Sequence, residues 1–435
     1  MSKRLKQRKI LLVCLIVVTS AAPAFFIRLN EPTFQLNTWK LLAKIGSLCG
    51  TVLIFWQFLL GYRQAVARWA TPDYLWLIRV HRWIGISIGL LILLHPIFLT
   101  PYYLQKKGVL LYSLGLPEPL RLFVPLGITA LAILLYLVIS SVFLRARMGH
   151  NLWYLTHLSS YVLLPLAFVH GYPIGMTLGG TGLKYVWQGL FFAGALFYIW
   201  RILARFGVFS SIYKVVLARK AAEGVTDITM RPLRGGLKPE AAQFAFFRRC
   251  RICPSRPFTI SKHNSDSGEI CITVKAFGNE TGRFQTLTPG SRILVDGPYG
   301  VFGREAFDTK RPVVMLAGGI GITPFRRIIH ELEGMPDREA YLFWGNRFEK
   351  DIALREEIDG AEHIEVVHVL SGVETHEELE TGYVDLDLLN QRLGRDLPAF
   401  EFFICGPPPM IRKLESDLLA SGVPDSQIHH ELFSY

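Results

Sequence analysis

Charged side chains are scarce in the first half of this 435-residue chain. Charged residues make up 19% of the whole sequence and hydrophobic residues 51%. Nearly all of the long apolar runs lie within residues 10–205, whereas residues 206–435 carry a charge every few positions. This uneven distribution excludes an ordinary soluble protein and predicts a membrane half followed by a soluble half.

Motifs for several other functions are missing from the sequence. Cys250 and Cys253 form one C-x-x-C without a second pair, so we expect free thiols rather than a zinc or iron–sulfur site. No EF-hand loop for calcium is present, which favours constitutive activity, and the usual G-x-G-x-x-G dinucleotide fingerprint is absent. The net charge of +12 is not accompanied by a basic-plus-aromatic motif, so we expect no nucleic-acid partner.

Six stretches of the first half are apolar enough to cross a lipid bilayer. Each has close to the ~20 residues that the hydrocarbon core requires. They are residues 9–29, 39–61, 80–100, 121–143, 152–172 and 183–204. The first stretch follows a basic segment but lacks a clear small-residue cleavage site, so we interpret it as a span and not as a signal peptide.

Basic residues gather in the N-terminal segment, in alternate loops and at the end of the last span. They are Lys3, Arg4, Lys6, Arg8, Lys9, Arg63, Arg68, Arg79, Arg82, Arg145, Arg147, Arg201 and Arg205. The positive-inside rule then places both termini and the soluble half in the cytoplasm. We therefore expect an integral protein of the plasma (cell inner) membrane with six spans.

Two of the predicted spans each contain a pair of histidines. His81 and His95 lie in the third span, and His157 and His170 lie in the fifth. Fourteen helical residues rise ~21 Å and return to within ~40° of the same face, so His81 and His95 share a face near opposite sides of the bilayer core. If the two spans are parallel, His81 pairs with His157 and His95 with His170, and each pair can ligate one haem iron.

The 13-residue spacing of the second pair is less regular. A straight helix would leave His157 and His170 about 140° apart, and a kink at Pro165 is one way to correct this. A polar contact between helices and a proton relay are the alternatives, but four histidines paired at two depths favour haem ligation. Arg82 follows His81 and pairs with a haem propionate or snorkels to the interface.

The soluble half reads as two folded parts. Short strands separated by turns follow residue 211, which predicts an antiparallel β-barrel. Further on, an apolar strand at residues 313–317 meets a glycine turn and a helix that Pro324 opens. Such a turn lets the backbone approach a phosphate at the helix N-terminus. Alternating β and α segments then predict a doubly wound α/β domain.

Four features together identify a family resemblance: "RPFTIS" at 256–261, "GGIGITP" at 318–324, "CGPPPM" at 405–410 and the two spaced histidine pairs. The second half resembles the ferredoxin–NADP reductase superfamily. The whole chain resembles the NADPH oxidase and ferric reductase family of transmembrane flavocytochromes b. The resemblance implies FAD, two haem b groups and NADPH, in a six-helix bis-haem domain (1–207), a β-barrel FAD domain (208–311) and an α/β NADPH domain (312–435).

The resemblance also implies roles for individual residues. Arg256 and Thr281 would hold the FAD pyrophosphate, Phe258 would lie along the flavin, and Thr259 would hydrogen-bond near its reactive edge. Tyr435, at the end of the chain, would stack on the flavin, with Phe433 as the competing candidate.

The nicotinamide dinucleotide would be held by the residues of two motifs. Those in the glycine turn that would cradle it are Gly318, Gly319, Gly321 and Thr323. Those that would lie beside the nicotinamide are Cys405, Gly406 and Pro407. Cys405 has a second reading as a buried thiol at a strand end. Arg347 stands where the family reads the adenosine 2′-phosphate, which favours NADPH over NADH.

The resulting prediction is an oxidoreductase that passes electrons from NADPH through FAD and two haems to an acceptor on the outer face. O₂, giving superoxide, is the leading acceptor and a ferric chelate the second. Leu99 stands where family oxidases often place a further histidine. Two other hypotheses are a haem- or quinone-binding subunit without catalytic activity and a six-span transporter with a regulatory domain.

Overall fold

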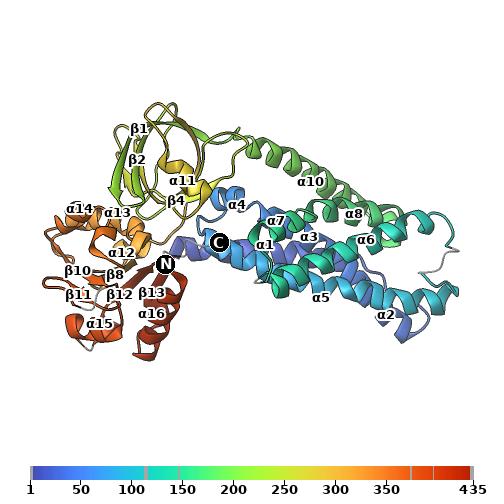
Figure 1. Cartoon of the computed structure of the whole chain (residues 1–435). Helices are drawn as coiled ribbons and strands as arrows, with labels where there is room; N and C mark the ends of the chain where they lie inside the picture. The colour runs from blue at the N-terminus through green and yellow to red at the C-terminus, as the bar shows by residue number, and fades with distance from the viewer. Residues whose placement is uncertain (1–2, 112–115, 146, 373–374, 395, 432–435) are drawn as a thin grey trace. The chain divides into compact units, whose positions relative to one another are not determined.

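The chain folds as two compact units, which the computed structural model describes over most of their length (Figure 1). The first unit holds Arg4–Ile202, and the second begins at Leu203. The described residues are 3–111, 116–145, 147–372, 375–394 and 396–431.

The first unit is built from helices. They are α1 (Lys3–Ala21), α2 (Phe34–Lys44), α3 (Gly50–Gly61), α4 (Arg63–Trp69), α5 (Tyr74–Lys107), α6 (Leu120–Ile139), α7 (His150–His157), α8 (Ser160–Ile174), α9 (Met176–Gly179) and α10 (Leu183–Arg205). Short π-helical segments, Ile45–Cys49 and Ser140–Leu144, join α2 to α3 and extend α6. In the described part of the chain, six helical segments are long and apolar enough to span a membrane, as predicted.

The spanning helices are apolar on their outer faces as well as in their shared core. Val52, Phe55, Ile88 and Leu164 belong to the buried cluster at the centre of the unit. Phe192 on α10, in contrast, exposes 65% of its surface. Exposed apolar side chains on spanning helices suit a hydrocarbon solvent, in which helices satisfy their own backbone hydrogen bonds.

The second unit starts with a seven-stranded antiparallel sheet among the described residues. Its strands run in the order β4-β3-β7-β1-β2-β6-β5. They are β1 (Ser211–Ala222), β2 (Val225–Pro232), β3 (Phe244–Arg248), β4 (Arg256–Thr259), β5 (Lys262–His263), β6 (Ile270–Lys275) and β7 (Arg292–Tyr299), with α11 (Asn279–Gln285) and α12 (Arg304–Asp308). The backbone nitrogen of Ser261, just after β4, donates to Cys271 on β6, so the sheet curls into the predicted barrel.

A six-stranded parallel sheet follows in the described residues, in the order β11-β10-β9-β8-β12-β13. Its elements are β8 (Val313–Gly318), α13 (Thr323–Glu333), β9 (Ala340–Asn346), α14 (Arg355–Asp359), β10 (Ile364–Leu370), β11 (Glu380–Thr381), α15 (Leu386–Leu393), β12 (Glu401–Cys405), α16 (Pro408–Ala420) and β13 (Ile428–Glu431). Buried clusters cover both faces of the sheet. This is the predicted doubly wound domain, and its strand order reverses between β8 and β12.

The prediction that Cys250 and Cys253 are free thiols is wrong. The two residues form a disulfide in the loop between β3 and β4, and their Cα atoms lie 5.1 Å apart. That separation falls within the range of about 4.4–6.8 Å that a disulfide spans. The loop conformation brings the two Cβ atoms together, and residue spacing alone does not reveal this. Cys14, Cys49, Cys271 and Cys405 are free.

Candidate functional site

The four predicted histidines meet as two facing pairs inside the helical unit. The ring centroids of His81 and His157 are 6.5 Å apart, and those of His95 and His170 are 6.3 Å apart. Two imidazoles that bind one metal ion from opposite sides, with bonds of about 2.0–2.1 Å, place their centroids about 6 Å apart. Each gap therefore has the width that one haem iron requires.

Backbone carbonyls orient two of the four rings. The Nδ1 atom of His95 lies 3.1 Å from the oxygen of Ala43, and the Nδ1 atom of His170 lies 2.7 Å from the oxygen of Phe123. A carbonyl oxygen only accepts hydrogen bonds, so Nδ1 carries the proton and Nε2 keeps its lone pair. This is the tautomer of a histidine that ligates a metal through Nε2.

The His81–His157 pair has polar and aromatic neighbours. The indole of Trp153 lies 4.9 Å from the ring of His157, and the hydroxyl of Ser141 lies 3.4 Å from its Nδ1 atom. The side-chain nitrogen of Gln57 lies 3.2 Å from Nε2 of His81. Gln57 therefore has to turn away before that nitrogen binds a metal. Arg82, the next residue of α5, is exposed.

Two glycines make room for the His95–His170 pair. A Cβ atom at Gly127 on α6 would lie 2.4–2.7 Å from three atoms of the His170 ring. A Cβ atom at Gly46 would lie 2.7 Å from the backbone nitrogen of His95. Real Cβ atoms do not approach other atoms this closely, so a side chain at either position would displace a histidine. Sequence reasoning missed both glycines because their neighbours lie far away in the chain.

An interruption of the helix brings His157 and His170 to face their partners. α7 ends at His157, α8 begins at Ser160, and Leu158 and Ser159 form a turn between them. The rotation calculated for a straight helix therefore does not apply to this pair. The interruption lies ahead of Pro165, which is within α8.

The two nucleotide motifs of the soluble half meet at the point where the parallel sheet changes direction. "GGIGITP" follows β8 and "CGPPPM" follows β12, and these neighbouring strands are parallel. Their carboxyl ends lie at the same edge of the sheet, where α/β domains of this topology bind ligands. Gly319 has a φ of +52°, and its carbonyl oxygen accepts a hydrogen bond of 3.0 Å from the buried indole of Trp344.

Glycine is required in this turn because the second motif presses against it. A Cβ atom at Gly321 would lie 2.1 Å from the carbonyl oxygen of Cys405. A Cβ atom at Gly318 would lie 2.6 Å from the sulfur of Met410 and 2.7 Å from Cδ of Pro407. The predicted residues Gly406 and Thr323 also lie here, after β12 and at the start of α13.

Cys405 and Glu431 form a buried pair that sequence reasoning only half identified. Cys405 is fully buried and lies opposite Glu431 in the register of β12 and β13. Burial and the neighbouring Glu431 raise the pKa of the Cys405 thiol, and burial raises the pKa of Glu431 to about 8. The Oε2 atom of Glu431 has no hydrogen-bond partner among the described residues. In the sequence Glu431 follows His429 and His430, and this polar context gives no signal of its burial.

Arg347 is exposed directly after β9, at the same edge of the sheet. Its guanidinium lies 5.2 Å from the ring centroid of Phe348. The nearby acid Asp351 accepts a hydrogen bond of 3.2 Å from the backbone nitrogen of Phe348 and so caps the short helix Glu349–Asp351. The carboxylate of Asp351 is therefore engaged locally, and Arg347 offers a positive charge to solvent.

The predicted flavin residues lie on and beside β4 of the barrel. Thr259 is buried, and its hydroxyl has no hydrogen-bond partner among the described residues. Phe258 packs at 4.9 Å against Phe284, and Arg256 begins the strand. An unpartnered buried hydroxyl costs free energy, so Thr259 fits a site that a ligand completes.

The remaining flavin candidates are Thr281, Tyr435 and Phe433. Thr281 lies in α11, and its hydroxyl accepts a hydrogen bond of 2.8 Å from the backbone nitrogen of Phe277. Tyr435 and its competitor Phe433 lie outside the described residues.

Comparisons with known proteins match both halves of the chain. Residues 46–168 match the family model of the ferric reductase like transmembrane component, and residues 315–416 match that of the oxidoreductase NAD-binding domain. The first match contains α5 and α7, which carry His81, His95 and His157, and it ends two residues before His170. The second match contains both nucleotide motifs. With its six spanning helices, the chain is an integral membrane protein.

Individual relatives are more distant. NADH-cytochrome b5 reductase 2 of Scheffersomyces stipitis is 28% identical over 166 residues, which cover 36% of this chain and 55% of that protein. A flavohemoprotein of Xylella fastidiosa is 28% identical over 225 residues, 49% of this chain and 56% of that protein. The chain thus spans about half the length of these curated relatives.

A solved ferredoxin reductase of carbazole 1,9a-dioxygenase has 22% identity and a TM-score of 0.46, covering 52% of this chain and 69% of its own. The family models are the stronger finding, because one contains His81, His95 and His157 and the other contains both nucleotide motifs. The chain joins a ferric reductase-like transmembrane component to an oxidoreductase NAD-binding domain, which matches a fused architecture like that of ferric reductases and NADPH oxidases.

Proposed function

We propose that the protein transfers electrons from cytoplasmic NADPH, through FAD and two b-type haems, to O₂ on the outer face of the membrane, giving superoxide. The two facing histidine pairs carry this proposal, because they lie in the same chain as an NAD-binding domain. When bound, FAD supplies the change from hydride to single-electron transfer, and the haems supply single-electron carriage.

The chain's own residues bind and orient these groups. His81 with His157 and His95 with His170 would ligate the irons, at positions about 21 Å apart along α5. The buried hydroxyl of Thr259 would bind the flavin edge, and Arg256 and Thr281 its pyrophosphate. The name of the flavohemoprotein relative combines a flavin and a haem, which supports the presence of these two kinds of group.

The NADPH site would lie at the switch point of the parallel sheet. The glycine turn of residues 318–321 would admit the pyrophosphate, and Arg347 would bind the 2′-phosphate. Cys405 and Glu431 would lie near the nicotinamide. Both residues are buried, so water is excluded from this part of the site. Because burial raises its pKa to about 8, Glu431 holds a proton on its carboxyl at neutral pH.

A ferric chelate is the second candidate acceptor. The match of residues 46–168 to the ferric reductase like transmembrane component favours it. A haem exposed at a membrane face can reduce either acceptor, so the identity of the acceptor requires a measurement.

The test uses the purified full chain supplied with FAD, haem and NADPH. Cytochrome c reduction is measured with and without superoxide dismutase, and ferric chelate reduction is measured without oxygen. Inhibition by the dismutase is expected if O₂ is the acceptor. Dismutase-resistant reduction together with fast anaerobic iron reduction would instead assign the ferric chelate. Absence of NADPH oxidation, or of haem absorbance, would refute the proposed function.

A further inference from the structure

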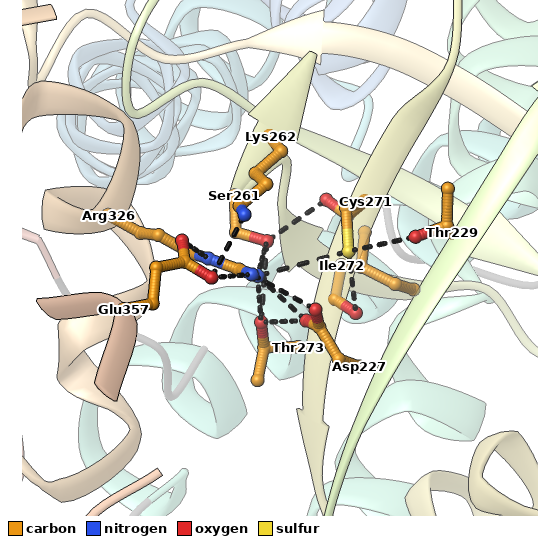
Figure 2. A network of polar contacts seen from close by, with 9 residues as sticks. All are labelled: Asp227, Thr229, Ser261, Lys262, Cys271, Ile272, Thr273, Arg326 and Glu357. Atoms are coloured by element: carbon orange, nitrogen blue, oxygen red, sulfur yellow. Dashed lines mark hydrogen bonds and ion pairs between the residues drawn. The ribbon is translucent and has the colours of Figure 1, made fainter. Parts of the chain in front are cut away.

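Arg326 is a buried arginine to which neither nucleotide motif assigns a role. It lies in the first turns of α13, three residues after Thr323, and only 1% of its side chain is exposed. Its guanidinium points from α13 toward the strands of the barrel (Figure 2). A buried charge is costly unless it is paired and hydrogen-bonded, so its partners define what it does.

Two carboxylates from different domains accept hydrogen bonds from the guanidinium. Nη1 and Nη2 donate to the two carboxylate oxygens of Asp227 at 2.8 and 3.1 Å, and Asp227 lies on β2 of the barrel. Nε and Nη2 donate to the two oxygens of Glu357 at 2.7 and 2.6 Å, and Glu357 lies on α14 of the nucleotide-binding domain. Both contacts are bidentate, which fixes the orientation of the planar group as well as its position.

Hydroxyl groups of the barrel complete the set of partners. Nη1 also lies 3.3 Å from the hydroxyl of Ser261 and 3.3 Å from that of Thr273, which in turn donates to Asp227 at 2.7 Å. Lys262, next to Ser261, forms a second ion pair across the two domains, 2.9 Å from Glu357. Two positive and two negative charges therefore meet, and the cluster (Asp227, Ser261, Lys262, Thr273, Arg326 and Glu357) is electrically balanced.

The cluster physically connects the two predicted cofactor motifs. Ser261 is the last residue of "RPFTIS", two positions after Thr259. Arg326 follows "GGIGITP" by two positions. The contact of 3.3 Å between them is thus a direct link from the strand that would bind the flavin to the turn that would bind the nicotinamide nucleotide.

We propose that Arg326 is a positioning residue, which holds the nucleotide-binding domain in one orientation on the barrel and so aligns the nicotinamide with the flavin. The role rests on the proposed function, because hydride transfer is the step that needs this alignment. In this role Arg326 would act without touching either ligand. Its two bidentate contacts, to Asp227 and Glu357, would fix the relative position of the two motifs. A shift of about 1 Å between reactants can slow a reaction about 100-fold.

The electrostatics of the cluster agree with a permanent link. Burial tends to lower the pKa of Arg326, but the hydrogen bonds to Glu357 and Asp227 outweigh it and raise that pKa. Burial likewise tends to raise the pKa of Glu357, but Arg326 and Lys262 bring it down to about 2. Arg326 and Glu357 therefore keep their charges throughout the physiological pH range.

The experiment compares three variants of the full chain with a matched control. Arg326→Met removes both bidentate contacts, and Arg326→Lys keeps the charge but cannot form two bidentate contacts. Lys262→Met removes only the half-exposed ion pair with Glu357. Arg392→Met is the control, because Arg392 pairs with Glu380 inside the nucleotide-binding domain and does not reach the barrel. Arg392 is outside the proposed cofactor sites.

Three quantities are measured for each variant. Spin labels at Lys220→Cys on β1 and Lys413→Cys on α16, in a Cys14→Ser background, report the distance between barrel and nucleotide-binding domain. Stopped-flow absorbance gives the rate of flavin reduction by NADPH, and a separate titration gives the Kd for NADP⁺. We expect Arg326→Met to broaden the distance distribution and slow flavin reduction about 10- to 100-fold, with little change in Kd. Arg326→Lys should show a smaller effect, Lys262→Met the smallest, and Arg392→Met none.

Several results would overturn the positioning role. They are unchanged distances in Arg326→Met, broadened distances with normal flavin reduction, and slow reduction caused by a weakened Kd. If Arg326→Met does not fold, Arg326→Lys decides, and wild-type behaviour in that variant refutes the proposal. If the unmodified protein does not reduce flavin with NADPH, the proposed function fails. The distance distributions alone then decide whether Arg326 holds the domains together.

Discussion

Thr259 places an unpartnered hydroxyl in the interior of the barrel, and this makes opposite predictions for the free and the flavin-bound protein. Thr259→Val should leave the stability of the flavin-free chain unchanged or higher, since an unsatisfied buried hydroxyl is removed. FAD binding should weaken about 2- to 10-fold, which corresponds to one net hydrogen bond of about 0.5–1.5 kcal/mol. Thermal unfolding without FAD and a fluorescence titration with FAD measure the two effects.

Thr226→Val on β2 is the matched control for this change, because Thr226 is a half-buried threonine of the same barrel. It should leave FAD affinity unchanged. Equal FAD affinity in the wild type and in Thr259→Val would remove Thr259 from the flavin site.

Glu431 makes a prediction about pH. Burial raises its pKa from 4.5 to about 8, so the folded protein favours the protonated form. A group with a raised folded pKa contributes stability that is present below the unfolded pKa and lost as pH rises through the folded value. The free energy of unfolding should therefore decline between about pH 4.5 and about pH 8.

Glu431→Gln should flatten this decline, because glutamine stays neutral at every pH. Urea unfolding of the full chain in detergent, repeated across that range, measures the slope. Glu378→Gln, at an exposed position, should keep the wild-type slope. An unaltered slope in Glu431→Gln would show that other groups cause the pH dependence.

Arg347 concerns the choice of nucleotide. Arg347→Ala should raise the KM for NADPH roughly 10- to 150-fold more than the KM for NADH, since only NADPH carries the 2′-phosphate and a charge-assisted contact is worth about 1.5–3 kcal/mol. Steady-state kinetics with both nucleotides measure the difference. Parallel increases for both would reassign Arg347 to a structural role.

At the level of the helices, α6 leaves space for the proposed ligand His170 on α8, because Gly127 has no side chain. Gly127→Ala would place a methyl group 2.4–2.7 Å from the His170 ring. We expect the ring to be displaced and the haem content to fall from two groups to one per chain, as measured by haem absorbance against protein concentration. The His81–His157 pair should keep its haem.

Gly189→Ala on α10 is the control, since a Cβ atom there meets nothing within 4 Å. Alanine also favours the helix over glycine by about 1 kcal/mol, so this variant should fold at least as well as the wild type. A full complement of haem in Gly127→Ala would contradict the assigned role of His170.

Across the whole molecule, the proposed carriers act in series. His81→Ala and His95→Ala should each stop electron delivery from NADPH to an acceptor enclosed in vesicles, while NADPH still reduces the flavin. Flavin absorbance and the absorbance of the enclosed acceptor are recorded together. Continued delivery in either variant would show that electrons take another route.

The helices, the strands and the motifs were predictable because their signals are local. Apolar runs of about 20 residues predict spans in any arrangement, and all six were confirmed. Short strands separated by turns likewise predicted the barrel, and the alternation of strands and helices predicted the doubly wound sheet. His81 and His95 could be placed on one face because they lie on one uninterrupted helix.

Other features depend on residues that are distant in the chain, and only the tertiary structure decided them. The turn at Leu158 and Ser159, the disulfide of Cys250 with Cys253 and the space beside Gly127 follow from packing and loop conformation. The buried Glu431 was invisible for the same reason, since a carboxylate's pKa depends on the neighbours that exclude water from it. Sequence alone therefore determined which side chains the protein carries and which helices and strands hold them, and the fold decided which of these side chains meet.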